Sequence, residues 1–148
     1  MFRGVTQLNL DNKGILAVPS KYRDSLITAC AGHLVITVDS PKCLLIYPKS
    51  AWEPIEQKLS SLSSFHPQIR SLQRLLIGNA NDVEMDSAGR ILVSLPLRQF
   101  AELTKNVVLV GQGAKFDLWD EEKWNQQIQD SLTLRNDDMS SELYGFSL

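Results

Sequence analysis

The sequence predicts an α+β fold built from two tandem units, each combining short β-hairpins with helices. The main observation is an internal repeat, in which residues 10–18 are echoed by residues 85–93 at an offset of 75 positions. A second echo downstream has a slightly shorter offset of 72 positions. Repetition of this kind indicates that one structural unit is present twice. The matched pairs are Asp11 with Asp86, Gly14 with Gly89, Val18 with Val93, Arg23 with Arg98, and Trp52 with Trp124.

The first unit begins with two predicted strands, residues 5–10 and 15–18, joined as a hairpin by the turn Asp11-Asn12-Lys13-Gly14. Asp accepts hydrogen bonds from its own downstream backbone, and Gly tolerates a positive φ. A short helix opens at Pro19-Ser20. Residues 34–38 and 43–47 form a second predicted hairpin, and a capping Ser50 starts a helix that bears Trp52.

The second unit repeats this plan after a predicted linker at residues 60–67 and a helix at residues 68–77 that ends at Gly78. Residues 83–85 and 90–93 form its first hairpin, and residues 107–110 and 115–119 form its second. A short helix has Pro96 in its first turn. Asp120 caps a last helix with Trp124, Ile128 and Leu132 on one face, and the polar, acidic sequence after Thr133 is expected to be frayed or mobile.

These elements divide the chain into four expected parts. They are unit one at residues 5–52, a helical linker at 53–80, unit two at 81–124, and a C-terminal helix with an acidic tail at 125–148. A unit of this size buries little apolar surface alone. We therefore expect the two units to pack as an intimate pseudo-twofold pair, with the turns at Asp11 and Asp86 related by that axis.

Composition excludes several classes of protein. The chain of 148 residues is 43% hydrophobic and 22% charged, as expected for a soluble globular protein. Neither a membrane span nor a signal peptide is predicted, so a cytoplasmic location is expected. Cys30 and Cys43 read as half-buried thiols, and His33 and His66 lack neighbouring metal ligands, so no metal site is predicted.

The charge is unevenly distributed along the chain. The formal net charge is −2, but residues 1–26 carry +2, residues 27–103 are neutral, and residues 104–148 carry −4. A local field steers a polyanion more than the total charge does. The first unit is thus modestly basic, although a solvated surface would have a similar composition.

An ordered set of motifs resembles the MraZ family, bacterial regulators with two SpoVT-AbrB-type units. The similarity runs from residue 1 to about 132, and the motifs match in order and spacing. They are Met1-Phe2-Arg3-Gly4, Leu10-Asp11-x-x-Gly14, Val18-Pro19-x-x-Tyr22-Arg23, Cys43-Leu44-Leu45-Ile46-Tyr47-Pro48, Trp52-x-x-Ile55-Glu56, Arg74-Leu75-Leu76-Ile77-Gly78, Met85-Asp86-x-x-Gly89-Arg90 and Phe116-x-x-Trp119.

The resemblance implies a swapped-hairpin β-barrel with flanking helices, assembly of copies into a ring, and sequence-specific binding to double-stranded DNA. It also implies a nucleoid-associated repressor that acts at the promoter of the division and cell wall gene cluster, and on its own expression. In this family a D-x-x-x-R motif in each unit carries the DNA contact. The second copy is intact as Asp86 and Arg90, whereas Ile15 replaces the arginine of the first.

The candidate DNA-binding residues lie in and near the two turns. We interpret both aspartates as turn-formers, and Arg90 either as a DNA contact or as a structural ion-pair partner of Asp86. Arg3 lies either beside the turns or in solvent. Lys21, Arg23 and Arg98 are interpreted as solvent-facing charges, and the three tryptophans as core or subunit interface. The candidates are Arg3, Asp11, Lys13, Gly14, Ile15, Asp86, Gly89 and Arg90.

No motif for catalysis occurs, so the sequence predicts no catalytic residue, cofactor, small-molecule substrate or membrane partner. A second hypothesis remains open. Because isoleucine offers neither a hydrogen-bond donor nor a charge, Ile15 would weaken DNA binding, leave the contact to Lys13, Arg3, Lys21 and Arg23, or abolish it. If binding is weakened or lost, the functional product would be an oligomeric scaffold or protein-interaction ring.

Overall fold

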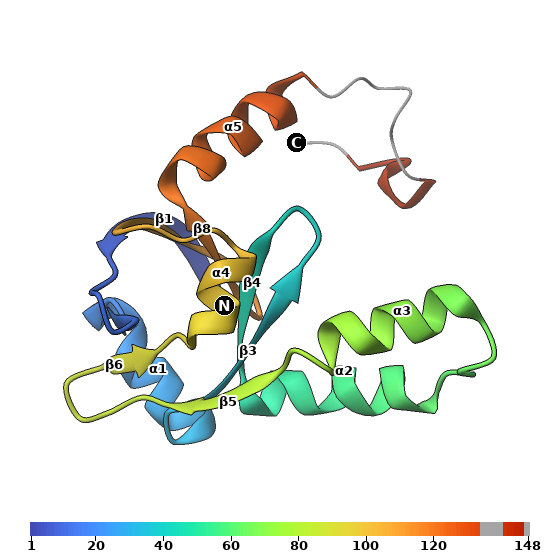
Figure 1. Ribbon diagram of the computed structural model, residues 1–148, viewed down its shortest axis with the longest axis horizontal. Helices are drawn as coiled ribbons and strands as arrows, with labels where there is room; N and C mark the ends of the chain where they lie inside the picture. Colours follow the sequence, from blue (N-terminus) through green and yellow to red (C-terminus); the bar gives the residue numbers. More distant parts are fainter. Residues whose placement is uncertain (134–140, 147–148) are drawn as a thin grey trace.

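The structure, a computed structural model, describes residues 1–133 and 141–146 and has the predicted α+β class. A six-stranded antiparallel sheet and a separate two-stranded ladder form its centre, and the five α-helices of the described part lie beside them or project from them (Figure 1). Most of the expected mobile tail lies outside the described residues. The strands are β1 (Phe2–Asn9), β2 (Ile15–Ala17), β3 (His33–Asp39), β4 (Cys43–Pro48), β5 (Asn81–Glu84), β6 (Arg90–Leu92), β7 (Asn106–Gly113) and β8 (Phe116–Asp120).

The helices lie around the sheet and partly away from it. α2 and α3 form a helical hairpin that projects to one side, and α5 rises from the end of β8 (Figure 1). The helices are α1 (Ser20–Cys30), α2 (Lys49–Ser61), α3 (Pro67–Leu76), α4 (Leu95–Phe100) and α5 (Glu121–Leu132), with a short 3-10 turn at Ser141–Leu143. No described helix is both long enough and apolar enough to cross a membrane.

Strand pairing differs from the sequence prediction in the first hairpin of each unit. β1 and β2 do not pair with each other, and neither do β5 and β6. Instead β1 pairs with β7, β2 with β6, and β5 with β3, so each pairing joins one unit to the other. The predicted hairpins β3–β4 and β7–β8 are confirmed. Alternating hydrophobicity identifies a strand but not its partner.

The exchanged strands give the fold a pseudo-twofold symmetry, as expected. In the repeat, β1 corresponds to β5, β3 to β7, and β4 to β8. The sheet order β1-β7-β8-β4-β3-β5 is therefore the same when it is followed from either edge. Leu45 faces Asp117 at the centre of the sheet, and Leu16 faces Ile91 at the centre of the ladder. Among the described strands, β1 and β5 are the edges of the six-stranded sheet, so the expected barrel is not closed.

One large hydrophobic core lies between the two units. It takes side chains from both, including the fully buried Leu16, Leu26 and Phe116. A smaller cluster on the other face of the sheet contains Trp119, against which Trp124 of α5 packs with ring centroids 5.8 Å apart. Trp52 and Trp119 are buried, which agrees with the core alternative. Both cysteines are free, with Cys30 half-buried and Cys43 fully buried.

Helix ends differ from prediction where side-chain capping was expected. α2 begins at Lys49 with Pro48 at its N-cap, not at Ser50. α3 ends with Ile77 as its C-cap, and Gly78 follows it. Asp120 does occupy the N-cap of α5, but its carboxylate accepts hydrogen bonds from the backbone N–H and hydroxyl of Thr104. Of the predicted stripe on α5, Ile128 and Leu132 are exposed.

Candidate nucleic-acid interface

The two turns share one hydrogen-bonding plan. In the first turn, Oδ1 of Asp11 accepts from the N–H groups of Lys13 (2.9 Å) and Ile15 (2.8 Å). In the second, Oδ1 of Asp86 accepts from the N–H groups of Ala88 and Arg90, both at 2.9 Å. The interpretation of both aspartates as turn-formers is confirmed. Each carboxylate fixes the backbone of the residue four positions later.

Each turn is bonded to the opposite unit. The N–H of Val18 donates to the carbonyl of Gly89, and the N–H of Val93 donates to the carbonyl of Gly14, both at 2.8 Å. The two glycines are buried and have φ values of +91° at Gly14 and +77° at Gly89. A side chain would be strained at these φ values. The turns are therefore related by the pseudo-twofold axis, as expected.

Between the turns, β2 and β6 form a two-stranded ribbon with one face toward solvent. Leu16 and Ile91 point into the core, with 0% and 2% exposure. Successive side chains of a strand alternate between faces. The outer face therefore carries the half-buried Ile15 and the exposed Ala17, Arg90 and Leu92.

Ile15 and Arg90 are diagonal neighbours on that outer face. The register pairs Ile15 with Leu92 and Ala17 with Arg90. Diagonal positions in such a ladder are roughly 7–8 Å apart. An arginine at position 15 would therefore stand close to Arg90, across the pseudo-twofold axis.

Arg90 also makes an ion pair within its own turn. Its Nε lies 3.0 Å from Oδ2 of Asp86, and 58% of the Arg90 side chain remains exposed. The pKa of Asp86 is lowered, first by the backbone N–H of Arg90 and further by its guanidinium. The pKa of Asp11 is lowered chiefly by the backbone N–H of Ile15. The structural ion pair considered for Arg90 is thus formed, on a side chain that still reaches solvent.

Comparison with known proteins identifies the family. The family model described as "MraZ protein, putative antitoxin-like" matches residues 1–75 and 76–144. The chain belongs to the MraZ family. It is 68% identical to a protein of Nitrosospira multiformis and 63% identical to one of Nitrosomonas europaea, over 148 residues and 100% of both chains in each case. A protein of Thiobacillus denitrificans is 53% identical over the same full length. All three relatives carry the name "Transcriptional regulator MraZ".

In this MraZ-family chain, the other basic candidates lie in different places. Lys13 is exposed within the first turn. Arg3 is near the start of β1, whereas the turn follows the end of that strand. The carbonyl of Arg3 accepts the hydroxyl of Tyr22 at 2.5 Å, and its backbone pairs with Gln112. Arg3 is therefore not brought to the turn at Asp11.

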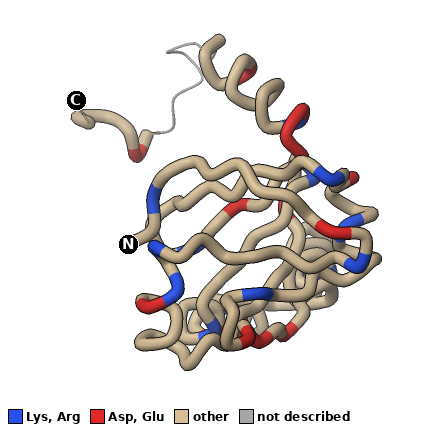
Figure 2. Tube along the Cα trace, turned by 90° about the vertical axis from the view of Figure 1, so that its left-hand side faces the viewer, with Lys and Arg blue, Asp and Glu red and all other residues tan. Residues whose placement is uncertain are grey.

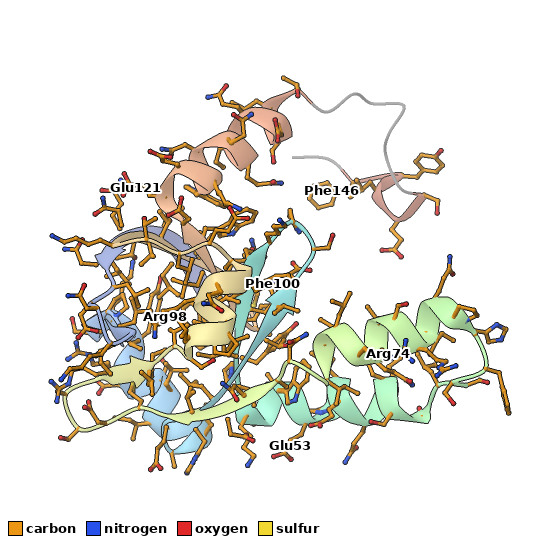
Figure 3. The ribbon with its side chains drawn as sticks, viewed as in Figure 1. Glu53, Arg74, Arg98, Phe100, Glu121 and Phe146 are labelled. Atoms are coloured by element: carbon orange, nitrogen blue, oxygen red, sulfur yellow. The ribbon has the colours of Figure 1, made fainter. Side chains whose placement is uncertain are left out.

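Two arginines expected to be simple solvent-facing charges, Arg23 and Arg98, are instead bonded to the backbone. Nε of Arg23 donates to the carbonyl of Val18 at 2.8 Å, and Nε of Arg98 donates to the carbonyl of Val93 at 2.9 Å. Both side chains are half-buried. Figure 3 shows Arg98 on the side of α4 nearer β6, and Phe100 on the side nearer the β3–β4 hairpin. Their recurrence in the repeat was the sequence signal that could have identified them.

The charged residues are not concentrated at the candidate interface. Basic and acidic positions are both spread over several elements (Figure 2), and two acids, Glu121 and Glu122, lie in the first turn of α5. Within residues 1–133 and 141–146, no group of three metal-ligating side chains is found. The candidate interface is thus a ribbon and two turns with few, individually placed cations.

Proposed function

We propose that this chain is a transcription regulator that binds double-stranded DNA through the ribbon β2–β6 and its two turns. In full, the proposal is sequence-specific repression at the promoter of the division and cell wall gene cluster, including its own expression, by a cytoplasmic, nucleoid-associated protein. Full-length relatives named transcriptional regulators support regulation rather than catalysis. The observation that carries DNA binding is Arg90, exposed on the ribbon and fixed by a hydrogen-bonded turn.

Arg90 has the chemistry that this function requires. A guanidinium presents a planar fork of donors that matches the acceptors of guanine or a phosphate. Asp86 holds the backbone of Arg90 through one carboxylate oxygen and its Nε through the other. An aspartate is poorly suited to face phosphates directly, so its role is to orient the arginine. Lys13 in the first turn supplies a second, less directional cation.

We further propose that several copies assemble into a ring. Each chain offers one arginine on its ribbon, because the equivalent position is Ile15. Multivalency raises the apparent affinity of such single contacts without any new type of contact. Apolar side chains exposed on α3, Leu72 and Leu75, and on α5, Ile128 and Leu132, are available for contacts between copies. We also propose that the chain is organised as unit one at residues 5–52, a helical linker at 53–80, unit two at 81–124, and a C-terminal helix with an acidic tail at 125–148.

A scaffold function is the alternative that Ile15 favours. If the first turn normally supplied the principal contact, its loss would leave a ring whose product is the assembly itself. The acidic balance of residues 104–148 suits binding to other proteins better than binding to DNA. The two functions make opposite predictions for DNA affinity.

The test measures affinity for a duplex containing the chain's own promoter region, by fluorescence anisotropy over a range of salt concentrations. We expect binding at low salt, and weaker binding by Arg90→Ala with a salt slope reduced by roughly one unit per lost phosphate contact. Ile15→Arg is expected to tighten binding, since it restores a donor fork beside Arg90. Lys58→Ala is the matched control, because Lys58 is an exposed cation on α2, outside the ribbon and its turns.

Sedimentation velocity on the same variants tests the ring. Ile15→Arg should leave the assembled mass unchanged if the ribbon faces DNA and not a neighbouring copy. Absence of low-salt binding by both the unchanged protein and Ile15→Arg would reject the DNA function. An assembled ring without DNA binding would then support the scaffold.

A further inference from the structure

We propose that Arg23, on α1 of the first unit, is the positioning residue for the turn that presents Arg90 in the second unit. Arg98, on α4, has the same role for the turn that carries Ile15. The support is crossed, so that each arginine holds the turn of the opposite unit. The consequence for DNA affinity rests on the proposed function, whereas the consequence for the turns themselves does not.

A short chain of hydrogen bonds links Arg23 to the second turn. Nε of Arg23 donates to the carbonyl of Val18 at 2.8 Å. The N–H of the same Val18 donates to the carbonyl of Gly89, also at 2.8 Å. Gly89 directly precedes Arg90 in the sequence. The backbone on which Arg90 stands is thus bonded to the residue that Arg23 holds.

The side chain of Arg23 also packs directly on the turn glycine. A Cβ added at Gly89 would lie 2.6 Å from both Cδ and Cζ of Arg23, closer than van der Waals contact allows. Gly89 therefore leaves the space that the guanidinium fills. Asp86 orients the turn from within, and Arg23 supports it from the opposite unit.

The first turn repeats these contacts with Arg98. Nε of Arg98 donates to the carbonyl of Val93 at 2.9 Å, and Val93 donates its N–H to Gly14. A Cβ at Gly14 would lie 2.7 Å from Nε of Arg98. Nη2 of Arg98 also lies 3.5 Å from the carbonyl of Lys13. Arg23 and Arg98 are structurally equivalent, but the turn that Arg23 holds is followed by Arg90, whereas the turn that Arg98 holds is followed by Ile15.

Amide hydrogen exchange, measured by NMR without DNA, tests the crossed support. Arg23→Lys keeps the charge but loses the planar donor at Nε. We expect amides of residues 86–90 to exchange about tenfold faster in Arg23→Lys, the effect of one lost hydrogen bond from a charged donor. Residues 11–15 should keep their rates. Arg98→Lys should produce the reverse pattern. Changes confined to the turn in the same unit, or no change in either turn, would overturn the proposal.

DNA affinity tests whether Arg23 acts through Arg90. We expect Arg23→Lys to weaken binding by about fivefold, and to have no further effect when combined with Arg90→Ala, since residues that act through each other are not additive. Lys58→Ala is the matched control and should leave affinity unchanged. Arg98→Lys should weaken binding less than Arg23→Lys does, because the turn that it holds presents only Lys13, and its effect should grow in the Ile15→Arg background.

Direct phosphate contact by Arg23 gives a different result. The loss in Arg23→Ala would then persist in the Arg90→Ala background, and the salt slope would fall by about one further unit. That result overturns the positioning role. If the unchanged protein does not bind DNA, the proposed function fails, and the exchange pattern still decides whether the crossed support exists.

Discussion

At the scale of single residues, the two turn aspartates differ in one contact. Both pKa values are lowered by backbone N–H groups, but only Asp86 also has an arginine side chain on its carboxylate. We expect Arg90→Ala to raise the pKa of Asp86 part of the way toward its ordinary value of 3.8, because the backbone hydrogen bonds remain. Titration of the side-chain carboxyl carbons by NMR measures both groups. Asp11 is the internal control and should not move.

The sign of the pH effect follows from these lowered values. A carboxylate with a lowered pKa in the folded protein stabilises it above the pKa of the unfolded chain, about 3.9. This contribution is lost as the pH falls through the pKa of the folded protein. The turns should therefore weaken below about pH 4. An unchanged Asp86 titration in Arg90→Ala would contradict the ion pair as a contributor.

The sequence predicted these turns well because their chemistry is local. An aspartate four residues before the last N–H that donates to its carboxylate, with a glycine between them, defines the loop without reference to the rest of the chain. The environment of Arg23 and Arg98 was not predicted because each side chain packs on a glycine of the other unit, Gly89 and Gly14 respectively. Position on a helix surface does not reveal such a partner.

At the scale of elements, the second hairpin of each unit was predicted correctly, whereas the first was wrong because its strands pair with strands of the other unit. The hairpins β3–β4 and β7–β8 have short connections that bring their strands together. The turns after β1 and β5 also have the sequence of hairpin turns. The N–H of Asp11 does donate to the carbonyl of Ile15, but this bond only closes the turn, and no ladder between β1 and β2 follows it. Beyond the turn, β2 gains a partner in β6 and buries Leu16 in the shared core.

A side-chain hydrogen bond links the end of helix α3 to the sheet. Oγ1 of the fully buried Thr37, on β3, donates to the carbonyl of Leu76 at 2.6 Å. No residue of α3 is itself buried. We expect Thr37→Val to cost about 1–2 kcal/mol of unfolding free energy, because the carbonyl loses its partner while the shape is kept.

Amide exchange in α3 separates this local effect from general destabilisation. Thr37→Val should speed exchange in α3 before it affects the strands β3 and β4. Thr37→Ser keeps the donor and should preserve the protection of α3, even if it loses packing of the methyl group. Equal protection of α3 in the Val and Ser variants would show that the hydrogen bond does not hold the helix.

At the scale of the whole molecule, the two units share the elements that each would need to fold alone. All eight residues of β1 pair with β7, and β5 pairs with β3. The main core contains Leu16 from the first unit against Ile91 from the second. The close packing of the two units was predicted from the length of the repeat, because a unit of that length cannot bury enough apolar surface by itself.

A fragment of residues 1–63 should therefore not fold as a monomer. It keeps the β3–β4 hairpin but loses the partners of β1 and β2. Because the units are related by a pseudo-twofold axis, two copies of the fragment could supply these partners to each other. We expect circular dichroism to show an unfolded chain at low concentration, and any structure gained at high concentration to be dimeric by sedimentation. Mixing it with residues 64–148 should restore a folded, one-to-one complex. Cooperative unfolding of a monomeric 1–63 fragment, independent of concentration, would contradict the shared core.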